Sequence, residues 1–273
     1  MSFVFELWIN KLILEITKKR KKMGKYYKKP FLNKVVAKVD YTADYNLPQK
    51  GLPRKVSDEI LRLFPIPEPR EVIAKQIHIT DQGVKEIQNK QHHLFFHGKS
   101  REKTLCITPK FLYIEINKYE TYEKLKDEFI LIVNNLSGKE DFSAKRFGLR
   151  YINQIKLTGK SLFDWDEYLN PILFSMVTLP ENKDMLSRAF SNVVQQFDDD
   201  MLLNFQYGMH NPDFPSRIKQ NLFILDYDAY FQGLISCDEI KANIDLAHER
   251  IENLFEKSIT QELRQLMEEE KDE

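Results

Sequence analysis

The sequence predicts an α+β fold in which a mostly antiparallel sheet is covered by helices on one side. Three observations lead to this prediction. Short stretches alternate apolar and polar residues, as half-buried strands do, and a few longer stretches repeat apolar residues at helical spacing. The order of these stretches is approximately duplicated along the chain. The composition, 42% hydrophobic and 30% charged over 273 residues, is that of an ordinary soluble globular protein.

The first half, about residues 30–140, reads as strand, helix, four strands and helix. Val35, Ala37 and Val39 occupy alternate positions, which predicts an opening strand with one buried face. A helix is expected over residues 53–64 and ends where two prolines follow, because proline cannot continue a helix. The four strands after it are expected at residues 72–79, 94–97, 104–108 and 111–117.

The helix that closes this half has the clearest pattern in the chain. Its apolar residues recur at steps of three and four, and Thr121 stands where an N-cap is expected. These residues are Tyr122, Leu125, Phe129, Ile132, Val133 and Leu136. The sequence therefore predicts a helix over residues 121–136 that packs its apolar face on the sheet.

The second half, about residues 141–267, repeats this order with three strands in place of four. Near the beginning of this half a short helical region is expected, and Pro171 breaks or kinks it. Ser236 and Glu239 have the spacing of a capping box and open a long final helix. The expected elements are a strand at 145–157, the helical region at 164–176, and strands at 186–197, 201–207 and 222–230. No clear linker separates the halves, so residues 23–273 are predicted to form a single domain. One continuous curved sheet and two helix-backed sheets both satisfy the order.

Residues 1–22 differ from the rest of the chain. A mostly apolar run precedes the basic tract at 18–22, which reverses the order of a secretory signal, and the run is too short for a membrane span of about 20 residues. It suits an amphipathic helix at a membrane surface, a short helix packed on the domain or on a partner, or translated sequence upstream of a native start at Met23. We favour the start at Met23, because lysine and arginine codons can be purine-only, like a ribosome-binding site.

The central strand, residues 146–153, is the main candidate for function. Alternate residues of a strand share a face, so Arg146 and Arg150 flank Gly148 on one face. Two guanidinium groups at this spacing suit a bidentate clamp for a phosphate or carboxylate, or each arginine pairs with a carboxylate from a neighbouring strand or helix. Tyr151 and Asn153 lie on the other face, at the end of an apolar stretch, and complete the set of ligand or partner candidates.

Weaker candidates come from acidic and histidine residues. Asp226 and Asp228 share one strand face and are candidate carboxylates for a divalent ion, as nucleases and related hydrolases use. The run Asp198-Asp199-Asp200 is typical of a turn, and His93 and His97 have no acidic residue or cysteine close in sequence. No residue is therefore assigned as catalytic, and none is assigned as a metal ligand.

Several function classes lose support from composition. The formal net charge is zero, whereas nonspecific duplex binding usually brings a basic excess. With nine glycines the chain has no Gly-rich phosphate loop and no Gly-x-Ser-x-Gly elbow, and no cofactor is predicted. Its two cysteines, Cys106 and Cys237, form no close-spaced ligand pattern and fit a reducing cytoplasm.

The motif at residues 146–153 resembles the central signature of an uncharacterised, sporadically distributed family of prokaryotic proteins. That signature reads Arg-aliphatic-Gly-Leu-Arg-Tyr-aliphatic-Asn or Asp, and Phe147 departs from it at the first aliphatic position. The resemblance spans roughly residues 30–267, including the segment 225–233 and the His248, Phe255 and Thr260 positions of the final helix. It supplies no catalytic or binding residues. The family's sporadic distribution implies horizontal transfer, as in mobile-element or anti-phage defence loci.

These observations favour a non-enzymatic binding or interaction protein of the cytoplasm, with no transmembrane segment. A protein partner or a second copy is expected at the final helix, because that helix is long and carries a charged face. That face consists of Glu249, Arg250, Glu252, Asn253, Glu256 and Lys257. The alternatives are a metal-dependent hydrolase or nuclease using Asp226 and Asp228, and a nucleic-acid-binding module using the Arg146 and Arg150 sheet face.

Overall fold

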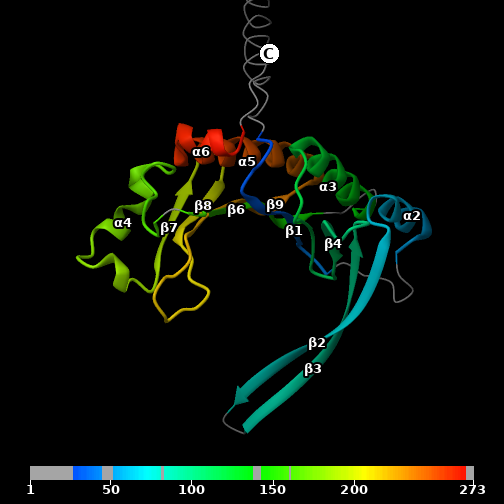
Figure 1. The fold of residues 1–273 in the computed structure, drawn as a ribbon. Coiled ribbons are helices and arrows are strands. Elements are labelled where there is room, and N and C mark those ends of the chain that lie inside the picture. The colour runs from blue at the N-terminus through cyan, green and yellow to red at the C-terminus, as the bar shows by residue number, and fades with distance from the viewer. Residues whose placement is uncertain (1–26, 45–51, 81–82, 138–142, 160, 269–273) are drawn as a thin grey trace, which may run out of the picture.

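The described residues form one nine-stranded antiparallel sheet with helices packed on one of its faces (Figure 1). The computed structural model describes residues 27–44, 52–80, 83–137, 143–159 and 161–268, and for 74–80 and 83–89 it describes the backbone alone. The strand order is β2-β3-β4-β5-β1-β6-β9-β8-β7. This confirms the predicted fold class and shows that the strands form one continuous sheet, not two separate ones. The predictions for residues 1–22 lie outside the described residues.

The strands follow the predicted order with adjusted lengths. They are β1 (Leu32–Tyr41), β2 (Ile66–Thr80), β3 (Gly83–His97), β4 (Lys103–Ile107), β5 (Phe111–Ile116), β6 (Ala144–Lys156), β7 (Ala189–Gln196), β8 (Met201–Met209) and β9 (Leu222–Ile235). The helices are α2 (Arg54–Leu63), α3 (Tyr122–Leu136), η1 (Pro171–Phe174), α4 (Ser175–Thr178), η2 (Lys183–Met185), α5 (Cys237–Ser258) and α6 (Gln261–Leu266).

The duplicated element order has a counterpart in space. In the first half the last strand, β5, pairs with the first, β1, and in the second half β9 pairs with β6 in the same way. The first strands of the two halves, β1 and β6, then pair antiparallel with each other at the middle of the sheet. The two halves therefore meet through their first strands, and the corresponding helices α3 and α5 lie over the same face (Figure 1).

The core lies between the sheet and these helices. Val35, Ala37 and Val39 of β1 are fully buried, and Phe147 and Leu149 of β6 continue the same layer. Above them pack the apolar faces of α3 and α5, whose N-termini are capped as predicted. Thr121 accepts from the backbone N–H of Lys124, and Ser236 and Glu239 form a complete capping box. Burial of these faces is the main stabilising contribution expected for helices of this kind.

Two segments differ from the prediction. Strands β2 and β3 run fifteen residues each and form a hairpin arm that projects away from the helices (Figure 1). The sequence prediction placed strands only at 72–79 and 94–97, because residues 83–93 contain few apolar residues. The helical region predicted at 164–176 is reduced to η1 and the four-residue α4. Pro171 is the first residue of η1, so the helical turns begin only in the second half of the predicted region and extend to Thr178. Proline is tolerated at the first position of a helical turn but not in its interior.

Among the described residues, no helix is both long enough and apolar enough to cross a membrane.

Candidate functional site

The two arginines of the central strand are engaged by acidic residues of β9. Arg150 donates from Nε to Asp226 Oδ1 at 2.8 Å and from a second nitrogen to Asp226 Oδ2 at 2.5 Å. Arg146 donates to Asp228 Oδ2 at 3.2 Å, and its guanidinium lies 4.4 Å from the centre of the Tyr230 ring. These pairs correspond to the predicted alternative in which each arginine meets a carboxylate from a neighbouring strand. They also place the candidate carboxylates Asp226 and Asp228 in ion pairs.

The electrostatics of this face agree with such pairing. The hydrogen bonds that Arg150 donates to Asp226 raise the pKa of Arg150, against the opposing effect of burial. Burial raises the pKa of Asp228, and Arg146 and Arg150 oppose that shift. The space beside Gly148 is bordered by the Arg146 guanidinium and by Tyr230, both about 3.5 Å from where a Cβ would stand. The arginine side chain itself therefore covers the glycine.

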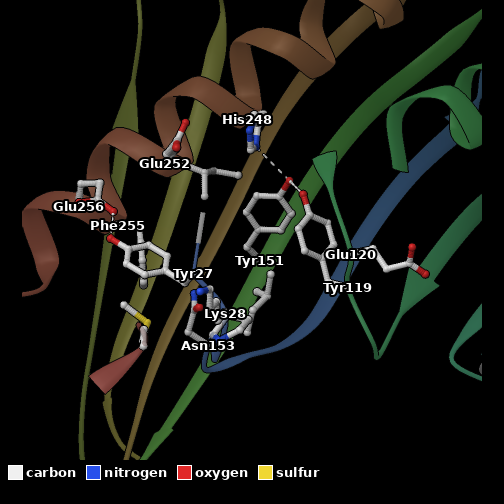
Figure 2. A pocket seen from close by; sticks show the side chains of 14 residues that line it. Tyr27, Lys28, Tyr119, Glu120, Tyr151, Asn153, His248, Glu252, Phe255 and Glu256 are labelled. Atoms are coloured by element: carbon white, nitrogen blue, oxygen red, sulfur yellow. Dashed lines mark hydrogen bonds between the residues drawn. The ribbon is translucent and has the colours of Figure 1, made fainter. Parts of the chain in front are cut away.

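Tyr151 and Asn153 lie on the opposite, helix-covered face, where they line a pocket (Figure 2). The pocket has a volume of about 200 Å³ and is formed by four parts of the chain. These are the segment leading into β1, the turn before α3, the end of β6 and the C-terminal half of α5. Met267, which follows α6, also borders the pocket. The lining residues are Tyr27, Lys28, Pro30, Leu32, Tyr119, Glu120, Tyr151, Asn153, His248, Ile251, Glu252, Phe255, Glu256 and Met267.

One wall of the pocket is a chain of hydrogen-bonding rings. The Tyr151 hydroxyl lies 3.0 Å from His248 Nδ1 and 3.3 Å from the Tyr119 hydroxyl (Figure 2). The Tyr122 ring stacks on the imidazole of His248 at a centroid distance of 3.8 Å, and its hydroxyl donates to Asp245. The stack and the hydrogen bond hold the imidazole in one orientation, so the position of its two nitrogens relative to Tyr151 is fixed by packing.

The three hydrogen-bonding rings of this wall are uncharged at neutral pH. Burial lowers the pKa of His248 to about 4, because a charged imidazolium is poorly solvated there. Burial also raises the pKa of Tyr119 and of Tyr151 far above the ordinary value for a phenol. The neutral imidazole of His248 shares a hydrogen bond with the Tyr151 hydroxyl through Nδ1, and Tyr151 shares a second one with the Tyr119 hydroxyl. The wall therefore presents fixed, neutral donors and acceptors.

Asn153 is the unusual member of the pocket. It is 6% exposed as a whole residue, and its carboxamide makes no hydrogen bond to any of the described residues. Its amide atoms are not among the buried side-chain atoms that lack a partner, so they face the open space of the pocket. A fully buried amide without a partner costs on the order of 1–3 kcal/mol, and the opening of the Asn153 amide onto the pocket avoids that cost. Asn211, for comparison, is 8% exposed, donates to the carbonyls of Ser187 and Ser216, and accepts from the Asp213 N–H. The amide of Asn153 is thus left free to meet something in the pocket.

Sequence reasoning named Tyr151 and Asn153 as ligand candidates and placed Glu252 and Glu256 on the charged face of the final helix, but it did not bring these residues together in one pocket. Tyr151 and Asn153 stood out at the end of an apolar strand face. His248 and Phe255 were named only as positions of the resemblance, although with Ile251 they share the helical spacing that places them on one side of α5. Tyr27 and Tyr119 belong to irregular segments far from β6 in sequence. No pattern within their own segments signals that they converge on this pocket.

The remaining candidates lie apart from the pocket. Asp199 of the acidic turn accepts from Arg250 of α5. His97 is buried beside Thr104, and His93 lies near the rings of Phe95 and Phe111. Within the described ranges, no three histidine, cysteine, aspartate or glutamate side chains are grouped so that they could hold a metal ion.

Two comparisons with known proteins were made on this chain. No family model matches it, and no curated protein does. Neither identifies a relative.

Proposed function

We propose that the protein is a non-enzymatic binding protein and that the pocket beside Tyr151 and Asn153 is its ligand site. The observation that carries this proposal is the amide of Asn153, which has no hydrogen-bond partner among the described residues and opens onto a pocket of about 200 Å³. A binding site typically combines an apolar lining with a few placed polar groups. Here the apolar lining comes from Leu32, Ile251 and Phe255, and the polar group is the amide.

A binding role is favoured over catalysis because the polar groups are poorly suited to proton transfer. A general acid or base works best with a pKa near the working pH. The pKa of His248 lies near 4 and those of Tyr119 and Tyr151 are raised, so none of the three changes charge near neutral pH. The carboxylates considered for a metal-dependent hydrolase, Asp226 and Asp228, are ion-paired on the other face of the sheet. Pairing of Arg146 and Arg150 also weakens the case for nucleic acid there.

The pocket favours a small, uncharged group. Its volume is below the roughly 300–1,000 Å³ typical of sites for drug-sized ligands, so it suits a single ring or one side chain of a partner protein. The aromatic walls match a planar body, and an amide is best matched by a group that both donates and accepts. A carboxamide or nucleobase edge, or an asparagine or glutamine side chain of a partner, has this chemistry.

The setting of this activity is part of the same proposal. The resemblance in residues 146–153 suggests a cytoplasmic protein of a mobile-element or anti-phage locus, with another protein of that locus as partner. The apolar stripe of α5 packs on the sheet through Ile240, Ile244 and Ile251, so a partner at the final helix meets its charged face. On that face Glu252 and Glu256 border the pocket.

The test compares matched probes on the full-length protein. Nicotinamide, nicotinate and benzylamine share a six-membered aromatic ring but carry a neutral amide, an anion and a cation. Ligand-observed NMR at millimolar concentration should show binding of nicotinamide, weaker binding of the two charged probes, and loss of nicotinamide binding in Asn153→Leu. Adenine and uracil extend the neutral set. Equal binding by the wild type and Asn153→Leu, or binding of no neutral probe, rejects the pocket as the ligand site.

A further inference from the structure

Strand β7 forms one edge of the sheet. The first three residues of β7 are at least partly covered, but residues 192–196 are all exposed. Val193 and Val194, on opposite faces of the strand, are 50% and 54% exposed. An edge strand also directs the N–H and C=O groups of every second residue away from its neighbour. This segment therefore presents open backbone groups between exposed β-branched side chains.

Natural sheets usually protect such an edge with charge, proline or a very short strand. The opposite edge of this sheet, β2, is protected in that way, because Pro67 and Pro69 lie in it and are interleaved with Glu68, Arg70 and Glu71. Strand β7 reads Ala-Phe-Ser-Asn-Val-Val-Gln-Gln and contains no charged residue and no proline. Proline and charge thus protect the β2 edge but not the β7 edge of the same sheet. This difference indicates that β7 pairs with a strand of another chain.

The charges that flank β7 indicate what pairs with it. Arg188, just before the strand, is exposed, and its guanidinium lies over the rings of Phe190 and Phe214 at about 5.8–5.9 Å. Within the described part of the chain it has no acidic partner. Asp198 and Asp200, just after the strand, are exposed and likewise have no basic partner there, whereas Asp199 is held by Arg250. The strand is basic at its beginning and acidic at its end.

We propose that β7 pairs antiparallel with β7 of a second copy, so that two sheets join into one across a two-fold axis near Val194. In this arrangement residue 192 of one copy lies opposite residue 196 of the other. The basic end of each strand then meets the acidic end of its partner, so that Arg188 of one copy approaches the Asp198–Asp200 turn of the second. Parallel pairing would instead place like charges together at both ends.

This pairing closes on itself. A two-fold interface uses the same surface on both copies, so the dimer offers no further β7 edge for a third. Growth beyond the dimer would have to use β2, where proline and charge oppose it. Dimerisation thus covers the unprotected edge and leaves the protected one outside.

The first experiment measures mass in solution by light scattering coupled to size exclusion, on the full chain from about 1 to 200 µM. The wild type should be a dimer at the upper concentrations. Val194→Lys should be a monomer throughout, because it places two ammonium groups together near the two-fold axis. Leu234→Lys, which changes another exposed apolar residue on a different strand, should leave the dimer intact. Circular dichroism checks that both variants are folded.

A charge-exchange experiment tests the orientation. Arg188→Asp alone and Asp198→Arg alone should each weaken dimerisation by roughly fivefold or more, because two symmetric pairs are lost in each case. The double variant restores the pairing with reversed polarity and should recover most of that loss. A monomeric wild type, a Val194→Lys variant that still dimerises, or higher oligomers in place of the dimer each overturn the proposal. Failure of the double variant to recover overturns the antiparallel arrangement.

Discussion

At the scale of single residues, a substitution of Asn153 should abolish ligand binding without lowering the stability of the fold. Its amide has no hydrogen bond to lose in the described part of the fold, and it lines a pocket that also contains apolar and aromatic side chains. Asn153→Leu should therefore leave the free energy of unfolding unchanged or raise it slightly, as measured by urea denaturation. Asn211→Leu is the matched control, since it removes three hydrogen bonds from a similarly buried residue. It should cost about 2–3 kcal/mol, and equal costs for the two variants would contradict this account.

Arg150 is expected to behave as a structural residue. Its partner Asp226 is 6% exposed, so Arg150→Ala leaves a buried carboxylate without its counter-charge. The cost should lie below the roughly 3–5 kcal/mol of a fully buried pair, because the Arg150 side chain is 43% exposed and solvent screens the interaction. Arg146→Ala should cost less, because its contact with Asp228 is longer and its guanidinium partly rests on Tyr230. Thermal unfolding of both variants tests the ranking, and Asp226→Asn combined with Arg150→Ala should recover part of the loss.

His248 should make the fold sensitive to mild acid. Its pKa is lowered to about 4 in the folded protein, against about 6.5 when unfolded. Between these values the unfolded chain binds more protons, so stability is present above pH 6.5 and falls as the pH drops towards 4. The loss at pH 5 should reach about 2 kcal/mol. His248→Gln should lose correspondingly less between pH 7 and pH 5 in urea denaturation, and parallel profiles for the two proteins would refute the assignment.

The residues of the pocket show how far sequence reasoning reaches at this scale. Strand alternation was enough to place Tyr151 and Asn153 on the face opposite Arg146 and Arg150. It was not enough to find Tyr27, Tyr119 and His248, because their proximity to β6 depends on how the helices and the segment leading into β1 pack on the sheet. A periodic pattern reports the environment of its own segment, whereas this pocket is assembled from four.

At the scale of elements, a buried ion pair ties β4 to α3. Lys103 Nζ lies 2.6 Å from Glu128 Oε1 and 4.5 Å from the centre of the Phe64 ring, and Glu128 Oε2 has no partner among the described residues. Lys103→Met should therefore destabilise the protein by about 3–5 kcal/mol, because it leaves a buried carboxylate unpaired. The double variant Lys103→Met with Glu128→Leu should return close to wild-type stability. A double-mutant cycle in urea measures this coupling, and additive effects would exclude it.

Among the elements, helix α3 was predicted most accurately from the sequence, and the β2–β3 arm least accurately. Residues 122–136 were assigned correctly because the buried face of an amphipathic helix is visible in the sequence as apolar residues that recur every three or four positions. The arm is held by backbone pairing between β2 and β3 beyond the point where β4 ends. Residues 83–93 include Val84 and Ile87 but little other apolar content. Backbone hydrogen bonds leave no trace in hydrophobic alternation, so the length of the arm could not be read from it.

At the scale of the whole molecule, the two halves should unfold together. Strands β1 and β6 pair along most of their length, and one continuous hydrophobic core runs through both halves. Trp165 fluorescence reports on the second half once Trp8 is replaced by Phe, and labelling of the buried Cys106 thiol reports on the first once Cys237 is replaced by Ser. The two urea midpoints should coincide. Separate midpoints would show that the halves are independent domains.

The arm also determines how the molecule moves through water. Strand β4 pairs with β3 only as far as Leu94, which lies opposite Pro69 of β2. From position 69 to position 80 the arm continues for eleven residues, a reach of roughly 36 Å at about 3.3 Å per residue. Such a projection adds friction far out of proportion to its mass. We therefore expect the protein to sediment more slowly than a compact sphere of equal mass, and shortening the hairpin should raise its sedimentation coefficient even though the chain becomes lighter.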